Sequence, residues 1–121
     1  MTAGGTIRLV VADDEPQVRN VLVRLFEEEG FAVVGAACDG VEAAKMALTL
    51  APDVVLMDLR MPNLGGIEAT GQIHARQPDV RIVVLSAYED PVLKDEAQAA
   101  GASAFLVKGC PAADLLDAVC A

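Results

Sequence analysis

The chain has 121 residues, of which 54% are hydrophobic and only 3% aromatic, and its formal net charge is -9. This length suits one domain with an aliphatic core, and the acidic charge argues against nucleic-acid binding by this segment. No apolar run approaches the roughly 18 residues that cross a membrane, and no secretory signal begins the chain. We therefore expect one cytoplasmic domain over residues 1–121, with a flexible stretch at residues 1–6 and no membrane contact.

Short apolar segments alternate with segments of helical periodicity along the chain. Runs of mostly branched residues predict strands at 7–12, 32–37, 53–58, 81–86 and 103–107. Apolar residues at helical spacing predict a helix that begins at Pro16 and further helices at about 40–50, 66–77, 91–100 and 111–119. The alternation predicts an α/β fold, a doubly wound five-stranded parallel sheet with five helices on its two faces.

The cysteines are three in number and scattered, which argues against a disulfide framework or a zinc site. We interpret Cys38, Cys110 and Cys120 as reduced residues that pack in the interior.

Charged and reactive residues stand at the predicted carboxyl ends of four strands. They are Asp13, Asp14 and Glu15 after the first strand, Asp58 at the end of the third, Ser86 at the end of the fourth and Lys108 after the fifth. Ligands of open α/β sheets bind outside the carboxyl ends of the strands. We therefore expect these side chains to form one site.

The acidic members of this group predict a Mg²⁺ site. Carboxylate oxygens suit Mg²⁺ rather than zinc, because no cysteine or second histidine accompanies them. Asp14 and Asp58 are expected as direct ligands, and Asp13 binds directly or through water. Glu15 is equally consistent with a further acid of the site and with a first-turn carboxylate stabilised by the helix dipole. Simple helix capping by Asp13 and Asp14 would leave the reactive residues at the other strand ends unexplained.

The same group permits phosphoryl chemistry. A carboxylate beside Mg²⁺ can attack phosphorus to form an aspartyl phosphate. Asp58 stands alone at the end of a buried strand and is the best candidate nucleophile. Lys108 would supply an ammonium group, and Ser86 a hydroxyl group, for the phosphoryl oxygens.

Four stretches, VADDEP, LMDLRMPNLGGIEA, VVLSA and GASAFLVK, resemble in order and spacing the landmarks of response-regulator receiver domains of two-component signalling. The intervals are 44 positions from Asp14 to Asp58, 28 from Asp58 to Ser86 and 22 from Ser86 to Lys108. GASAFLVK is most similar to receivers that precede a LuxR-type helix-turn-helix. The resemblance implies a flavodoxin-like fold with strand order 2-1-3-4-5, and an effector domain that normally follows residue 121 and controls transcription.

The resemblance also implies roles for individual residues and partners. Asp58 would accept a phosphoryl group from a histidine kinase, with Mg²⁺ as the cofactor. At matching positions, the metal would be bound by Asp13, Asp14, Asp58 and the backbone carbonyl of Arg60. Lys108 would pair with the phosphate, and Ser86 and Phe105 would move during switching. Phosphorylation would produce a homodimer, and no independent enzymatic turnover is expected. Phe105 is also consistent with a plain core aromatic. Arg60 and Tyr88 would tune the access of water to the acyl phosphate.

Two positions depart from the family pattern. Gly109 follows Lys108 where many receivers have proline, so the conformation of that peptide is not predicted. Gly65 occupies a position that is often acidic, which suggests a more flexible loop after the third strand.

Other functions compete with this interpretation. A receiver-like module that binds a partner without phosphorylation would keep the fold, but it would not need all five reactive positions. Aspartate-dependent phosphatases use a second acid two residues after the nucleophile, where this chain has Arg60. A flavin-binding protein would need neutral phosphate donors after the first strand, and DDEP would repel phosphate.

Overall fold

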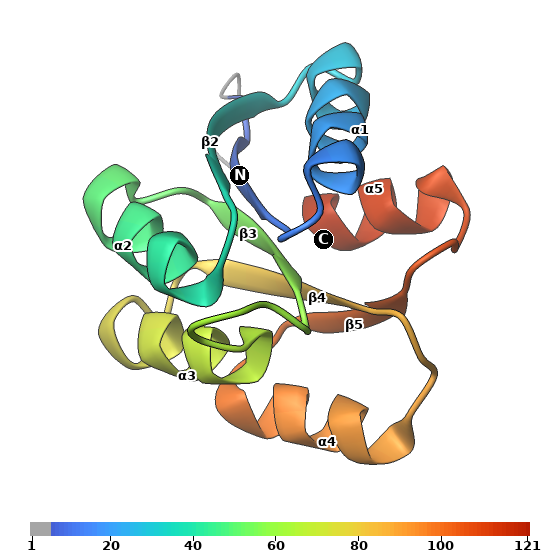
Figure 1. Ribbon diagram of the computed structural model, residues 1–121. Coiled ribbons are helices and arrows are strands. Elements are labelled where there is room, and N and C mark those ends of the chain that lie inside the picture. Colours follow the sequence, from blue (N-terminus) through green and yellow to red (C-terminus); the bar gives the residue numbers. More distant parts are fainter. Residues whose placement is uncertain (1–5) are drawn as a thin grey trace.

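The computed structural model describes residues 6–121, in which five strands alternate with five helices (Figure 1). The strands are β1 (Arg8–Ala12), β2 (Ala32–Ala37), β3 (Val54–Asp58), β4 (Arg81–Ser86) and β5 (Ala104–Val107). The helices are α1 (Pro16–Glu28), α2 (Gly40–Leu50), α3 (Gly66–Arg76), α4 (Pro91–Ala100) and α5 (Ala112–Cys120). Every predicted element is present within two residues of its expected bounds. Of the expected flexible stretch at residues 1–6, residues 1–5 lie outside the described part.

The strands form one parallel sheet in the order β2-β1-β3-β4-β5, as the flavodoxin-like expectation requires. The register pairs Ala12 with Met57, Asp58 with Leu85, and Ser86 with Val107. Consecutive strands of the sheet therefore end at nearly the same level. The reactive residues that follow them are brought to one edge.

Two apolar layers cover the faces of the sheet (Figure 1). Helices α1 and α5 lie on one face, where Leu22, Phe26, Leu115 and Val119 are buried. Helices α2, α3 and α4 lie on the other face, mainly with small residues such as Ala43, Ala47, Ala69 and Ala97. All five residues of β3 are buried, because this central strand has a helical layer on both sides. The phospho-acceptor candidate at its end is thus held by the most enclosed strand.

Helix ends are fixed by residues that the sequence supplies locally. Pro16 occupies the first turn of α1, and Pro91 that of α4, where a missing N–H costs no hydrogen bond. Asp39 caps α2 by accepting a hydrogen bond from the amide of Glu42. Gly101 ends α4 with a φ of 116°, a left-handed conformation that favours glycine.

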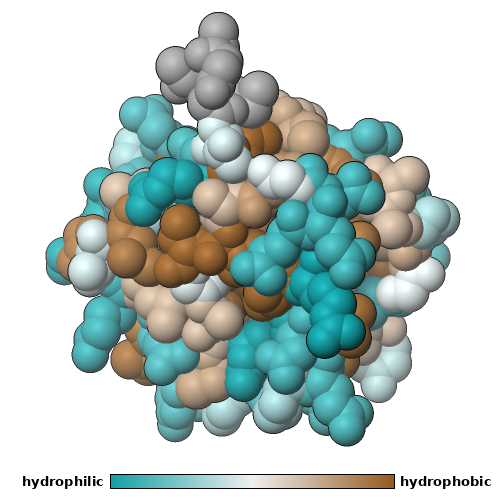
Figure 2. Space-filling model, turned by 90° about the horizontal axis from the view of Figure 1, so that it is seen from above, coloured by the Kyte–Doolittle hydropathy of each residue, from teal (hydrophilic) through white to brown (hydrophobic). Residues whose placement is uncertain are grey.

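The edge strand β2 is only partly covered, and most of its residues are intermediate in exposure. Figure 2, seen from the side on which β2 lies in Figure 1, accordingly shows hydrophobic residues at the surface between hydrophilic ones.

Within residues 6–121, no helix has the length and apolar character that a membrane crossing demands.

The interpretation of the cysteines as packing residues is wrong for two of the three. Cys38 and Cys120 are exposed, and only Cys110 is partly buried. Cys38 follows β2 just beyond the sheet, and Cys120 is the last residue of α5, so neither reaches the core.

Candidate functional site at the carboxyl edge of the sheet

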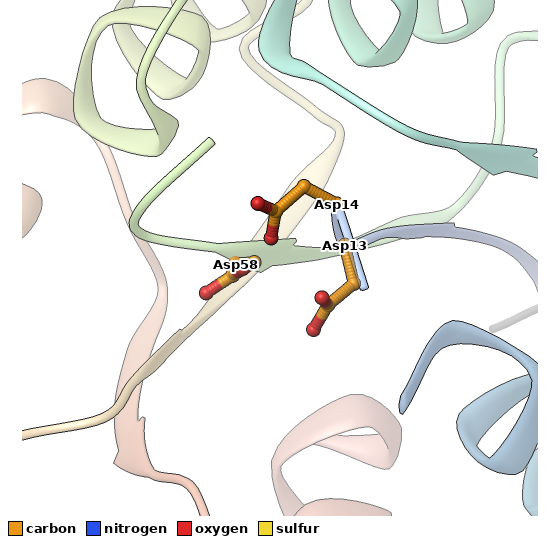
Figure 3. Close-up of side chains that lie close together, drawn as sticks. All are labelled: Asp13, Asp14 and Asp58. Carbon is orange, nitrogen blue, oxygen red and sulfur yellow. The ribbon is translucent and has the colours of Figure 1, made fainter. Parts of the chain in front are cut away.

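Three carboxylates meet where β1 and β3 end (Figure 3). Asp13 and Asp14 directly follow β1, and Asp58 is the last residue of the neighbouring strand β3. One oxygen atom from each of the three lies within 4.8 Å of the others. The predicted acidic cluster is therefore formed, because parallel pairing of β1 with β3 places the two strand ends side by side.

Lys108 completes the cluster from β5. Its Nζ atom lies 3.0 Å from Oδ2 of Asp13 and 3.1 Å from Oδ1 of Asp58. The side chains of these two aspartates are 1% and 7% exposed, whereas that of Lys108 is 29% exposed. Buried carboxylates are costly without a counter-charge, and the ammonium group supplies it. Residues 95 positions apart in the sequence thus form one ion-paired group.

The cluster has three carboxylates but only one ammonium group, so negative charge predominates. Burial, and then the charge of Asp13, raise the pKa of Asp58 from 3.8 to about 6, although Lys108 opposes the rise. Burial alone would lower the pKa of Lys108, but its hydrogen bonds and charge pairing with Asp13 and Asp58 raise it. Lys108 therefore keeps its positive charge, whereas ionisation of Asp58 costs free energy. A second cation would relieve that cost.

The three acids differ in how freely they can bind another ligand. Both carboxylate oxygens of Asp13 already accept hydrogen bonds, Oδ1 from the amide of Glu15 at 2.9 Å and Oδ2 from Lys108 at 3.0 Å. Asp14 is exposed. Glu15 is also exposed, stands at the N-cap of α1, and does not belong to the group of acids that the described residues bring together. Glu15 therefore precedes the first turn of α1, where its side chain makes no capping hydrogen bond, so neither alternative offered for it is matched as stated.

Ser86 lies at the expected strand end but is engaged elsewhere. The residue is 1% exposed, and its hydroxyl group donates to the carbonyl of Tyr88 at 2.8 Å. The same oxygen accepts from the amide of Tyr88 at 3.1 Å. The hydroxyl is thus turned into the β4–α4 connection, and reaching a phosphoryl group would require it to rotate away.

Arg60 and Tyr88, which follow β3 and β4, contact each other at the surface. The guanidinium carbon of Arg60 lies 5.4 Å from the centroid of the Tyr88 ring, within the range of a cation–π contact. Arg60 is exposed, and Tyr88 is 60% exposed. This pair joins the β3–α3 connection to the β4–α4 connection.

Phe105 lies in β5 and is partly buried, with its side chain packed against the core beneath α4. It also lines a cavity of about 250 Å³ with Glu89, Asp90, Pro91, Lys94 and Val107. The side chain therefore occupies an intermediate position, in contact with both the core and this surface cavity.

The two departures from the family pattern have definite conformations here. No peptide bond among residues 6–121 is cis, so the one between Lys108 and Gly109 is trans. Gly109 has a φ of 91°, which a glycine adopts without strain. Gly65 is extended at the N-cap of α3, and the prediction of a more flexible loop around it stays untested.

The sequence analysis missed two residues near this site, Asp39 and Asn63. The Nδ2 atom of Asn63 donates to Oδ2 of Asp39 at 2.6 Å, which joins the β3–α3 loop to the start of α2. Glu42 in turn accepts from the amide of Cys38 at 2.9 Å. The spacing Asp39-x-x-Glu42 is that of a capping box, a signal that would have placed the helix start but not its contact with Asn63.

A doubly wound parallel sheet with three acids and a lysine at its carboxyl edge is the arrangement that the resemblance to receiver domains implies. Residues 9–120 match the response regulator receiver domain family. The chain belongs to this family and is a receiver domain of two-component signalling.

Individual relatives agree with this assignment. Response regulator GacA of Pseudomonas aeruginosa is 38% identical over 93% of this chain and 53% of its own length. The transcriptional regulatory protein PdtaR of Mycobacterium tuberculosis is 40% identical over 93% of this chain and 54% of its own. A LuxR-family two-component response regulator from Aurantimonas sp. SI85-9A1 is 37% identical, with a TM-score of 0.88 over 93% of this chain and 81% of that one. The chain spans about half the length of the curated relatives it matches.

Proposed function

We propose that this chain is a phosphorylation-controlled switch in which Asp58 accepts a phosphoryl group from the phosphohistidine of a histidine kinase. The observation that carries the proposal is the position of Lys108, within 3.1 Å of Asp58 and 3.0 Å of Asp13. A carboxylate nucleophile with a fixed cation beside it meets the two main needs of phosphoryl transfer, positioning and charge stabilisation.

The donor atoms fit Mg²⁺ as the cofactor. All three side chains of the cluster offer carboxylate oxygens, which this hard cation prefers. Asp14 and Asp58 would hold the ion directly, the backbone carbonyl of Arg60 would add an oxygen, and Asp13 would bind directly or through water. Bound Mg²⁺ would neutralise part of the negative charge on the aspartates and on the incoming phosphoryl oxygens.

The transfer itself would use the Asp58 carboxylate as the nucleophile. One of its oxygens would form the bond to phosphorus as the phosphorus–nitrogen bond of the phosphohistidine breaks. The electron pair of the broken bond would stay on the imidazole nitrogen. Lys108 would then shift its pairing from the carboxylate to the phosphoryl oxygens, which carry more negative charge.

The switch would begin at Ser86. Its hydroxyl would leave the Tyr88 backbone and donate to the phosphoryl group, which would alter the β4–α4 connection. Phe105, intermediate between core and surface, would change its rotamer in response. Such a change shifts an existing equilibrium by the difference in affinity of the two states for the phosphoryl group.

The output surface would be formed by α4, β5 and α5. Phosphorylation would promote homodimerisation through this face, where Val92 is 63% exposed. The name of PdtaR and the LuxR-family structure support control of transcription by a segment beyond this one. The net charge of -9 makes DNA contact by the receiver itself unfavourable, so we expect no nucleic acid among its own partners.

A labelling experiment tests the assignment of Asp58. The wild-type chain, incubated with acetyl phosphate and Mg²⁺, should gain the mass of one phosphoryl group, and peptide mapping should locate it at Asp58. Asp58→Asn should abolish the gain. Asp53→Asn, at the residue that directly precedes β3, is the matched control and should label normally. Labelling that persists in Asp58→Asn would contradict the assignment.

A second measurement separates this proposal from a receiver-like module that works without phosphorylation. Addition of Mg²⁺ with beryllofluoride, a phosphoryl mimic, should shift the amide resonances of residues near Ser86 and Phe105. Sedimentation of the same sample should report whether the dimer forms. Spectra that change with neither Mg²⁺ nor beryllofluoride would favour the phosphorylation-independent module.

A further inference from the structure

The start of α2 and the loop that follows β3 are fastened together by a side-chain hydrogen bond. Nδ2 of Asn63 donates to Oδ2 of Asp39 at 2.6 Å. The other carboxylate oxygen of Asp39 accepts from the amide of Glu42 at 2.8 Å, which caps α2. We call the Asp39–Asn63 pair the loop clamp. It joins two connections that are 24 residues apart in the sequence.

Backbone packing supports the loop clamp. A Cβ atom on Gly40 would lie 2.0 Å from the carbonyl oxygen of Leu64, so only glycine permits the loop to rest on the first turn of α2. Asn63 has a φ of 67°, a left-handed conformation that asparagine tolerates better than most residues. The side chain of Asn63 is thereby presented to Asp39 by a specific backbone turn.

The base of the same loop is closed by a backbone bond. The amide of Gly66 donates to the carbonyl of Leu59 at 2.9 Å. Arg60 lies inside the loop, between this closure and the loop clamp. Its backbone carbonyl is the proposed metal donor that lies within this loop.

We infer that Asp39 and Asn63 are positioning residues for the magnesium site, which hold the loop so that the Arg60 carbonyl stays available to the ion. The inference rests on the proposed function. Groups that orient metal ligands affect metal affinity although they do not touch the ion. A loop already held in its binding conformation loses less conformational entropy when the metal binds.

The loop clamp is a charge-assisted hydrogen bond. The amide of Glu42, and then the side chain of Asn63, lower the pKa of Asp39, so its carboxylate is ionised near neutral pH. The pair lies at the surface, where such bonds contribute modestly. Its removal should therefore weaken Mg²⁺ binding measurably without unfolding the domain.

Two variants remove the Asp39–Asn63 hydrogen bond but keep the other structural role of each residue. Asp39→Ser retains a good N-cap for α2, and Asn63→Gly retains a residue that accepts a positive φ. Each should raise the dissociation constant for MgCl₂, measured by amide shifts in NMR titration, about two- to fivefold. The double variant should be no weaker than either single variant, because both changes remove the same bond.

A rescue variant distinguishes positioning from general damage. In Asp39→Asn with Asn63→Asp the amide and carboxylate change places, and asparagine still caps α2. This swap should restore wild-type Mg²⁺ affinity. Hydrogen exchange of the Leu64 amide, which should be faster in each single variant, should return to the wild-type rate. In both single variants the Mg²⁺ concentration that gives half-maximal labelling by acetyl phosphate should rise. The labelling rate at saturating Mg²⁺ should stay near that of wild type.

The outcomes separate the two levels of inference. Wild-type Mg²⁺ affinity in both single variants, or additive losses in the double variant, would overturn the positioning role and leave the proposed function intact. A wild-type chain that binds no Mg²⁺ would overturn the proposed function, and the positioning role with it.

Discussion

At the scale of single residues, the site is a balance between buried negative charge and one lysine. Asp13 and Asp58 are both buried, and a single ammonium group lies between them. Burial first, and then the charge of Asp13, raise the pKa of Asp58, and the one ammonium group only partly opposes the rise. The domain therefore keeps at its strand ends a charge arrangement that favours an added cation.

The cost of this arrangement should be visible in metal-free protein. The folded-state pKa of Asp58 lies at about 6, above its ordinary value of 3.8, so ionisation above pH 6 destabilises the fold and protonation below pH 4 removes that effect. Asp58→Asn should therefore raise the free energy of unfolding by about 1–2 kcal/mol at pH 8 in EDTA, and by little at pH 4. Urea unfolding across this pH range is the measurement. Asp53→Asn should show no such pH-dependent gain.

A second residue-scale cost lies in α3. Among residues 6–121, the hydroxyl of Thr70 is the buried side-chain polar group that has no hydrogen-bond partner. Thr70→Val keeps the branched shape and removes the hydroxyl, so it should stabilise the fold by about 1 kcal/mol. Thr70→Ser keeps the hydroxyl and loses the methyl group, and it should destabilise instead. Equal thermal stability of the two variants would contradict this reasoning.

At the scale of elements, α3 is seated on the end of β3 by a glycine. A Cβ atom on Gly66 would lie 2.2 Å from the backbone carbonyl oxygen of Asp58. The first turn of α3 therefore packs directly against the backbone of the proposed phospho-acceptor. The order of elements follows from sequence periodicity, but this approach depends on how strand and helix meet.

Two glycines of α3 provide a matched pair. Gly66→Ala should destabilise the domain by about 2 kcal/mol or more, because its methyl group meets backbone that cannot rotate away. Gly71→Ala, in the same helix, has open space around the added Cβ and should stabilise by about 0.5–1 kcal/mol. Thermal and urea unfolding of both variants give the test. A Gly66→Ala variant as stable as wild type would show that the helix can shift without cost.

At the scale of the whole molecule, the sheet couples the site to global stability. Asp13 and Asp14 follow β1, Asp58 ends β3 and Lys108 follows β5, so the proposed Mg²⁺ site would exist only when the sheet is assembled. A ligand that binds the folded state alone stabilises it by mass action.

This coupling predicts the effect of magnesium on unfolding. At a Mg²⁺ concentration one hundred times its dissociation constant, the free energy of unfolding should rise by about 2.7 kcal/mol. The rise should vanish in Asp58→Asn and return to zero when EDTA removes the ion. Thermal unfolding with and without Mg²⁺ measures it, with Ca²⁺ as a comparison for ion selectivity. No stabilisation of wild type at any Mg²⁺ concentration would contradict the proposed site.

The sequence by itself determined the elements, the parallel sheet and the set of reactive residues. Branched apolar runs and helical spacings are local, and the carboxyl ends of parallel strands share one edge, so Asp13, Asp14, Asp58 and Lys108 could be expected together. Their roles in binding Mg²⁺ and phosphate remain predictions.

Only the tertiary structure decided which contacts these residues make. That Lys108 bridges two buried aspartates, that the Ser86 hydroxyl is held by Tyr88, and that Asn63 binds Asp39 all depend on side-chain directions and loop conformations. Such contacts join residues far apart in the chain or in irregular connections. Periodicity carries no information about them, because it reports which face of an element is buried and not what that face or its ends will touch.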